Sequence, residues 1–281
     1  MRIDSHQHFW LLSRGDYDWL GPSFEALYRD FLPDDIRGHL QAGDIDQTIL
    51  VQATDKLAET QYLLSLADEN AFIAGVVGWV AMDTPAGQAD LQKLSQQPRF
   101  LGVRPMLQDI NDRNWMLKSE LDPAFQILLR ENLSFDALVK PEHLDNLHTL
   151  MLRYPSLNVV IDHGAKPDIA SGEFDLWADN ISRIAKDTNA YCKLSGLLTE
   201  AGHCASDTEI QPYMQHLLAC FGPRRLMWGS DWPVLNLASD YAHWHSMVQT
   251  FIAPLPADDQ AAIMGTSAQH FYRLHKHHST I

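Results

Sequence analysis

The sequence predicts an α/β fold, a single-domain (β/α)8 or TIM barrel built on eight parallel strands. Short apolar runs recur between longer amphipathic stretches, and this alternation is the pattern of such a barrel. Most of the runs are continuously apolar, as expected for parallel strands buried on both faces. The length of 281 residues is typical of one barrel. No linker or low-complexity segment divides the chain, so we assign residues 1–281 to one domain.

Eight short segments have the composition of strands, and their spacing leaves room for a helix after most of them. In chain order, the predicted strands are Arg2–His6, Gln47–Gln52, Phe72–Trp79, Phe100–Arg104, Leu133–Val139, Leu157–Asp162, Ala190–Leu194 and Leu226–Ser230.

Helices are predicted from their start and stop signals. Pro33, followed by two aspartates, begins the first helix, and Gly43 ends it. The other predicted helices are Asp55–Asn70, a helix that begins at Pro141 and is followed by Pro155, Asp175–Asp187, Asp207–Phe221 and Tyr241–Phe251.

The connection between the first strand and the first helix, from Phe9 to Leu32, is unusually long and rich in aromatic residues. A loop of this length in a compact domain usually has a function, and in a barrel it would lie over the carboxyl-terminal face. It could instead be an aromatic plug that only caps the barrel. The two roles are compatible.

The first and last strands predict a cluster of polar side chains. His6 and His8 lie at the end of the first strand and point to the same side of it, because side chains alternate with period two. Asp231 follows the eighth strand. In a closed barrel these strands are neighbours, so the three side chains would face one metal ion or one substrate. Alternatively, the histidines are a buried structural pair and Asp231 caps the next helix.

Other polar residues lie at predicted strand ends. Gln52 ends the second strand, Arg104 the fourth and Lys140 the fifth, while Lys193 lies within the seventh, where its direction is less certain. The basic residues could bind a substrate oxygen, or they could pair with the many acids of the chain. Gln52 could bind a hydroxyl group or have a structural role.

Composition limits the partners. A net charge of −15 argues against nucleic acid and against an anionic membrane surface. No apolar run approaches the roughly 18 residues of a membrane span, and no basic leader precedes the first strand. Cys192, Cys204 and Cys220 form no C-x-x-C motif, which favours a reduced, cytoplasmic compartment. The sequence is compatible with a monomer and with a homo-oligomer.

Seven motifs occur in order along nearly the whole chain. They are Asp4-Ser5-His6-Gln7-His8-Phe9-Trp10, the pair Tyr17-Asp18-Trp19-Leu20 and Arg29-Asp30-Phe31-Leu32-Pro33, then Gly102-Val103-Arg104, Asp162-His163-Gly164, Trp228-Gly229-Ser230-Asp231-Trp232-Pro233 and Gly265-Thr266-Ser267-Ala268-Gln269-His270-Phe271-Tyr272. This set resembles the amidohydrolase-2 branch of the amidohydrolase superfamily, which contains sugar-lactone hydrolases such as L-fuconolactonases and L-rhamnonolactonases.

The resemblance implies a (β/α)8 barrel that hydrolyses its substrate at the carboxyl-terminal face. The sequence departs from the superfamily pattern in its metal ligands. Many metal-dependent members place a histidine or a carbamylated lysine on the fourth or fifth strand, but the fifth strand here has no histidine. His6, His8 and Asp231 would then hold one Zn²⁺ at most, and we expect the metal not to be strictly required.

The resemblance also suggests roles. Asp231 would be the general base that takes a proton from water, and His163, at the end of the sixth strand, would polarise the lactone carbonyl. His163 could alternatively cap the following loop. Trp19 would offer an apolar face to the C–H side of a sugar ring, and we assign it to substrate binding together with Arg104, Lys140 and Gln52.

A neutral polyhydroxy lactone is the preferred substrate. A dicarboxylate would require several arginines at strand ends, and only Arg104 is clearly placed there. One rival is a zinc-dependent decarboxylase or amide hydrolase of the same superfamily. The other is a non-catalytic sugar-binding barrel.

Overall fold

A computed structural model describes residues 1–202 and 206–274. Its eight strands follow one another around a single sheet, and every consecutive pair is parallel. They are β1 (Ile3–Gln7), β2 (Gln47–Val51), β3 (Ile73–Gly78), β4 (Phe100–Val103), β5 (Ser134–Ala137), β6 (Asn158–Ile161), β7 (Tyr191–Leu194) and β8 (Leu226–Trp228).

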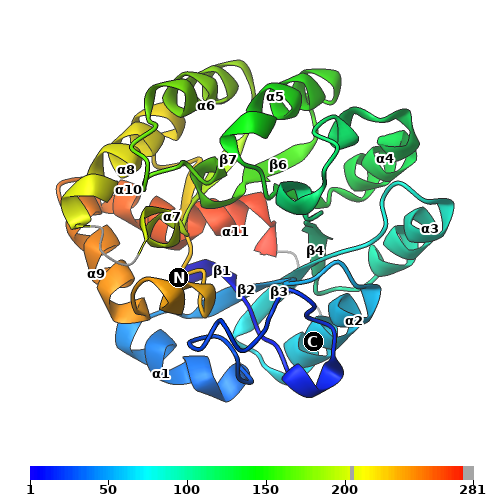
Figure 1. Cartoon of the computed structure of the whole chain (residues 1–281), viewed down its shortest axis with the longest axis horizontal. Coiled ribbons are helices and arrows are strands. Elements are labelled where there is room, and N and C mark those ends of the chain that lie inside the picture. The colour runs from blue at the N-terminus through cyan, green and yellow to red at the C-terminus, as the bar shows by residue number, and fades with distance from the viewer. Residues whose placement is uncertain (203–205, 275–281) are drawn as a thin grey trace.

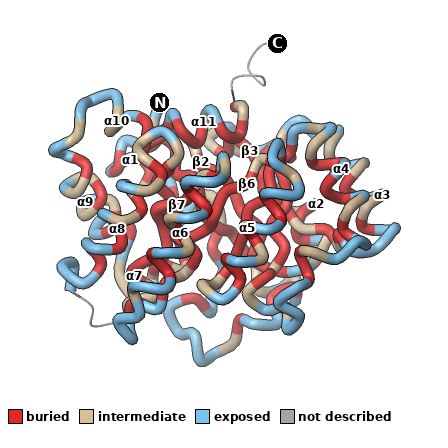
Figure 2. Tube along the Cα trace, turned by 90° about the horizontal axis from the view of Figure 1, so that it is seen from above, coloured by how far each residue is buried: buried red, intermediate tan, exposed pale blue. Residues whose placement is uncertain are grey.

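The barrel closes between β1 and the segment after β8. The backbone N–H of His8 donates to Trp232 O at 2.8 Å, and that of Asp231 donates to His6 O at 2.8 Å. Helices surround the strands (Figure 1), and buried residues are concentrated in the strands and on the helix faces that cover them (Figure 2). The predicted (β/α)8 barrel is confirmed.

The α-helices of the described residues are α1 (Pro33–Gly43), α2 (Leu57–Glu69), α3 (Pro85–Leu94), α4 (Asp122–Glu131), α5 (Leu144–Arg153), α6 (Asp175–Asp187), α7 (Leu197–Ala201), α8 (Asp207–Phe221), α9 (Tyr241–Ile252), α10 (Ala257–Ala261) and α11 (Ser267–Phe271). The predicted bounds of α1, α6 and α8 match. The helix predicted to begin at Pro141 begins at Leu144, after a 3-10 turn over Pro141–His143. The helices α3 and α4 were not predicted from the sequence.

The long connection between β1 and α1 is anchored to the barrel. Trp10 and Phe31 exchange backbone hydrogen bonds of 3.0 and 2.9 Å, and both side chains are fully buried. The Trp10 indole N–H donates to Arg29 O at 2.8 Å. These contacts hold the segment over the carboxyl ends of the strands, where Trp19 lies. Among the described residues, none of the helices combines the length and the hydrophobicity needed to cross a bilayer.

Candidate active site

A cavity of about 250 Å³ opens at the carboxyl ends of the strands. Of the residues predicted to act there, those that line it are His8, Trp19, Arg104, His163 and Asp231. They come from distant parts of the sequence, and they meet because parallel strands present all their carboxyl ends on one face of a barrel.

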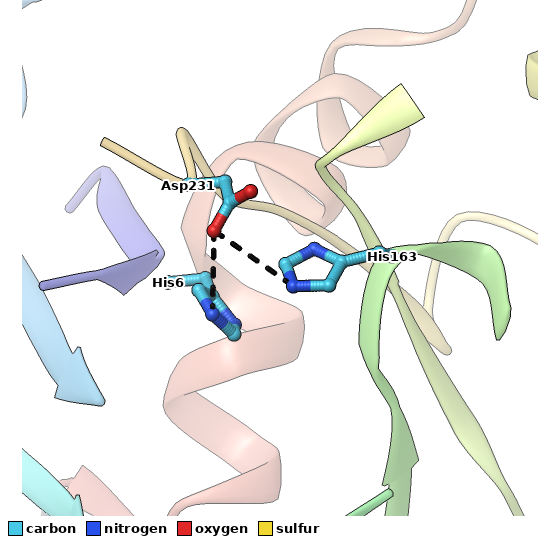
Figure 3. Close-up of side chains that lie close together, drawn as sticks. All are labelled: His6, His163 and Asp231. Carbon is cyan, nitrogen blue, oxygen red and sulfur yellow. Dashed lines mark ion pairs between the residues drawn. The ribbon is translucent and has the colours of Figure 1, made fainter. Parts of the chain in front are cut away.

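Asp231 lies at the centre of a group of imidazoles. Its Oδ1 is 3.3 Å from His8 Nε2, 3.7 Å from His6 Nε2 and 3.8 Å from His163 Nε2. Figure 3 shows the His6 and His163 rings pointing toward this oxygen from two sides. The structure therefore brings the histidine pair of β1 next to the aspartate after β8, and it adds His163.

The backbone around Asp231 determines where its carboxylate points. Asp231 has a φ of 58°, in the left-handed region, and its N–H is bonded to His6 O. The buried Asp4 carboxylate accepts N–H groups from Ser230 and His6, and so ties β1 to the segment after β8. In the next helical turn, Leu235 N–H donates to the Asp231 carbonyl. The side chain is thus left to face the cavity.

His163 is held by a tight turn after β6. It lies in the turn η6 (Asp162–Ala165) with a φ of 54°, and Ser195 Oγ is 2.8 Å from its Nδ1. A Cβ on Gly196, whose φ is +67°, would lie 2.7 Å from the His163 ring, so only glycine leaves room for the imidazole.

Burial determines the charges of these groups. It lowers the pKa of His163 to about 4, against the opposing effect of Asp231. Burial, with the nearby Lys193 charge, also holds the pKa of His6 well below its usual range. Burial alone would raise the pKa of Asp231, but His163 and the hydrogen bond to His8 outweigh it and hold that pKa far below its usual range. At neutral pH the site therefore contains neutral His6 and His163 next to an ionised carboxylate.

A buried ionic network lies beneath the cavity. Lys193 Nζ is 2.6 Å from Asp136 Oδ2, 3.0 Å from Asp162 Oδ1 and 3.1 Å from His6 Nδ1. Arg104 Nη1 is 3.4 Å from Asp162 Oδ2 and 3.3 Å from His6 Nε2. The Lys193, Asp136 and Asp162 side chains are 0% exposed. The two cations and two carboxylates fix the position of the His6 ring from below.

Most of this network was not predicted from the sequence. The direction of Lys193 was left open, and no role was predicted for Asp136 or Asp162. The available signal was a charged residue in the middle of an otherwise apolar strand, as in Phe135-Asp136-Ala137 and Cys192-Lys193-Leu194. Because a barrel strand is apolar on both faces, such a charge needs a buried partner.

The predicted substrate-binding residues have different surroundings. Arg104 lines the cavity, and Gln52 holds it in place: Gln52 Oε1 accepts from Arg104 Nη2 at 2.9 Å, and Gln52 Nε2 donates to Arg104 O at 2.8 Å. Trp19 lines the cavity, with its indole N–H bonded to Ala53 O at 2.8 Å. Lys140 is outside the set of residues that line the cavity, and its backbone N–H donates to His143 Nδ1.

The site contains donors for one divalent ion. Three possible ligand atoms lie within 4.8 Å of one another, one each from His6, His163 and Asp231. Three protein ligands are typical of a catalytic zinc site. His8, which was predicted to be a ligand, is outside this group: its Nδ1 lies 2.8 Å from Val51 O and its Nε2 lies 3.3 Å from Asp231 Oδ1, and His163 takes the predicted place of His8. The donors thus fit a metal, although the cations Arg104 and Lys193 beside His6 oppose its binding.

Comparisons with known proteins agree with this geometry. A family model described as "Amidohydrolase" matches residues 3–274. An L-fucono-1,5-lactonase of Burkholderia ambifaria is 42% identical over 97% of this chain and 96% of its own length. A second L-fucono-1,5-lactonase, from Burkholderia multivorans, is 35% identical over 98% of this chain and 96% of its own.

Solved structures of amidohydrolases are also similar to this chain. A crystal structure of an amidohydrolase from Burkholderia multivorans with bound HEPES superposes with a TM-score of 0.91 at 34% identity, covering 97% of this chain and 99% of that one. A structure of the same protein with bound zinc gives 0.90 at 35% identity with the same coverage. With a family match over almost its entire length, and with the barrel and strand-end site in place, this chain belongs to the amidohydrolase family.

Proposed function

We propose that the chain is a lactonase that hydrolyses a sugar-acid lactone, an aldonolactone such as L-fucono- or L-rhamnonolactone, to the free acid. The observation that carries the proposal is the ionised Asp231, surrounded by imidazoles in a cavity that also contains the Arg104 guanidinium. The two L-fucono-1,5-lactonases similar to this chain over nearly its full length support the choice of substrate class.

The reaction begins when water, hydrogen-bonded to Asp231, attacks the lactone carbonyl carbon. Asp231 takes the proton of the water as the new C–O bond forms. Negative charge then develops on the carbonyl oxygen, where the Arg104 guanidinium and the His163 Nε2–H stabilise it. The proton is on Nε2 when the Ser195 hydroxyl donates to Nδ1. When the ring C–O bond breaks, the carboxylic acid of Asp231 returns the proton to the departing alkoxide.

A divalent metal bound by His6, His163 and Asp231 would lower the pKa of a bound water and polarise the carbonyl. We propose that this contribution is helpful but not required. Arg104 and Lys193 already place positive charge at the base of the cavity, and an ester carbonyl needs less activation than an amide.

Metal-depleted protein should therefore keep at least about a tenth of its lactonase rate, which corresponds to a barrier increase of no more than about 1.4 kcal/mol. The measurement is turnover of one aldonolactone before and after chelation, with the metal content determined on the same sample. A fall to background that Zn²⁺ restores would contradict a metal-tolerant mechanism and make His6 and Asp231 obligate ligands.

The proposed substrate is uncharged because the cavity offers few free cations. Arg104 is paired with Asp162 at 3.4 Å, and Lys166, the other basic residue of the lining, is paired with Glu200 at 2.9 Å. A dicarboxylate would have to displace these pairs. A pH-indicator screen over aldonolactones, with and without chelator, tests the function. Binding without turnover would favour a non-catalytic sugar-binding barrel, and hydrolysis of amides alone would favour a zinc-dependent amide hydrolase.

Trp19→Ala should change the ranking of lactones while leaving part of the activity. Trp19 is 37% exposed and lines the cavity without carrying a group that takes part in the proposed reaction, so its loss removes a sugar contact and not a chemical group. The measurement is kcat/KM over the lactone panel, with Tyr28→Ala, an exposed aromatic of the same loop, as the matched control. An unchanged ranking would mean that Trp19 does not determine substrate selectivity and only covers the cavity.

We also place the enzyme in carbohydrate metabolism and in the cytoplasm. Cys192 and Cys220 are free thiols in the structure, as a reducing compartment would maintain them, whereas Cys204 lies outside the described residues.

A further inference from the structure

The cavity lining outside the Asp231 group combines polar and apolar side chains. Its polar side is formed by Gln108, Asp109 and Lys166, on the loops after β4 and β6, and Met106 and Leu138 also line the cavity. Trp19 and Val234, on the segments after β1 and β8, add apolar surface beside His8 and Asp231. A sugar ring likewise has hydroxyl groups to hydrogen-bond and C–H groups to pack on an aromatic ring.

The polar side is a connected set of hydrogen bonds centred on Lys166. Lys166 Nζ donates to Gln108 Oε1 at 3.1 Å and pairs with Glu200 Oε1 at 2.9 Å. Gln108 Nε2 in turn donates to Asp109 Oδ2 at 3.3 Å. An ammonium group has three N–H donors, and the two described acceptors satisfy two of them. Because Lys166 lines the cavity, the third can reach a group bound there.

The backbone ties Lys166 to the turn that holds His163. Lys166 has a φ of 50°, and its N–H donates to His163 O at 2.9 Å. The Trp177 indole N–H fixes the same turn by donating to Gly164 O at 2.7 Å. A ligand oxygen bound by Lys166 would therefore be held at a set position relative to the His163 imidazole.

We propose that Lys166, positioned by Gln108 and Glu200, is a specificity-determining residue that donates a hydrogen bond to a ring hydroxyl of the lactone, with the Asp109 carboxylate as a nearby acceptor. The proposal rests on the lactonase function proposed above and identifies the groups that recognise the sugar. Because Glu200 balances the charge of Lys166, the subsite suits a neutral hydroxyl rather than a second carboxylate.

The test compares two substrates in wild type and Lys166→Met. One is a polyhydroxylated aldono-1,5-lactone, and the other is δ-valerolactone, which has the same ring without hydroxyl groups. A site that hydrogen-bonds a substrate hydroxyl discriminates strongly against an analogue that lacks it. We expect kcat/KM for the aldonolactone to fall by about tenfold or more, mainly through KM, and that for δ-valerolactone to change by no more than about twofold. Where δ-valerolactone turns over slowly, its inhibition constant against the aldonolactone replaces kcat/KM.

Further variants test whether the effect depends on the hydrogen-bond donors of Lys166. Lys166→Arg retains N–H donors and should restore part of the preference, while Gln108→Leu, which removes a support of Lys166, should weaken it. Lys118→Met removes a lysine that pairs with Asp112 outside the cavity lining and should change neither substrate. An equal loss on both lactones, or no loss on the aldonolactone, would overturn the subsite alone. Absence of lactone turnover in the wild type would overturn the proposed function, and the subsite with it.

Discussion

Asp231→Asn should lower kcat for the best lactone by on the order of 10²-fold or more, with little loss of folding. The amide keeps the size of the side chain and one oxygen, but it cannot take a proton from water. Its neighbours His8 and His163, which line the cavity, remain in place to bind substrate. The loss should therefore appear in kcat more than in KM.

The measurement is steady-state kinetics, with circular dichroism to check folding and Asp55→Asn, an exposed aspartate, as the matched control. The loss should be constant from about pH 5 to about pH 8, because Asp231 stays ionised there and His163, with a pKa of about 4, stays neutral. Near-wild-type turnover in Asp231→Asn would remove this residue from the mechanism.

The sequence was sufficient to predict the barrel, and to predict that several strand-end residues meet at one cavity, for one physical reason. Parallel strands place their carboxyl ends together, so a polar residue that follows an apolar strand can be assigned to that face without knowing any contact. His8, Arg104 and Asp231 were found in this way, His163 was found through the family resemblance, and all four line the cavity.

Side-chain direction is harder to predict at strand ends, because it depends on register. Gln52 directly follows β2 but turns toward Arg104, and Lys140 lies beyond β5 at the start of a 3-10 turn. A shift of one residue in the strand register moves a side chain to the opposite face of the sheet. The stagger between neighbouring strands of a barrel cannot be deduced from the sequence of one strand. The same uncertainty concealed Lys193, which could have faced either the helices or the interior.

The polar side of the cavity was missed for a different reason. Gln108 lies in a 3-10 turn and Lys166 directly follows another, and such loops lack the periodicity that identifies strands and helices. Their convergence depends on the path of two separate loops over the barrel. It appears only in the three-dimensional structure.

Lys193→Met should destabilise the protein by about 3–5 kcal/mol, the usual result of removing one partner from a buried ion pair. Lys193 is completely buried and contacts Asp136, Asp162 and His6, so its loss leaves carboxylates in the barrel interior with too little positive charge. Asp162 would keep Arg104, and Asp136 would keep the hydroxyl of Tyr272 at 2.6 Å. Asp136 is therefore the group left without a charged partner.

The destabilisation should depend on pH in a defined direction. Burial raises the pKa of Asp136 even in the presence of the opposing Lys193 charge, and without Lys193 that pKa rises further. A carboxyl group whose pKa is higher in the folded than in the unfolded state favours folding below its unfolded pKa, and this contribution is lost as the pH rises through the folded value. Lys193→Met should therefore be closer to wild-type stability at about pH 5 than at about pH 8.

Urea unfolding of both proteins at these two pH values measures the effect. The matched control is Lys93→Met, which removes an exposed lysine paired with Asp90 and should change stability by less than about 1 kcal/mol. A second variant, Lys193→Met with Asp136→Asn, removes the unpaired charge and should recover part of the loss and most of its pH dependence. A Lys193→Met protein as stable as Lys93→Met at both pH values would show that the buried cation does not stabilise the barrel, and that Ser134, Tyr272 and Arg104 are sufficient partners for Asp136 and Asp162.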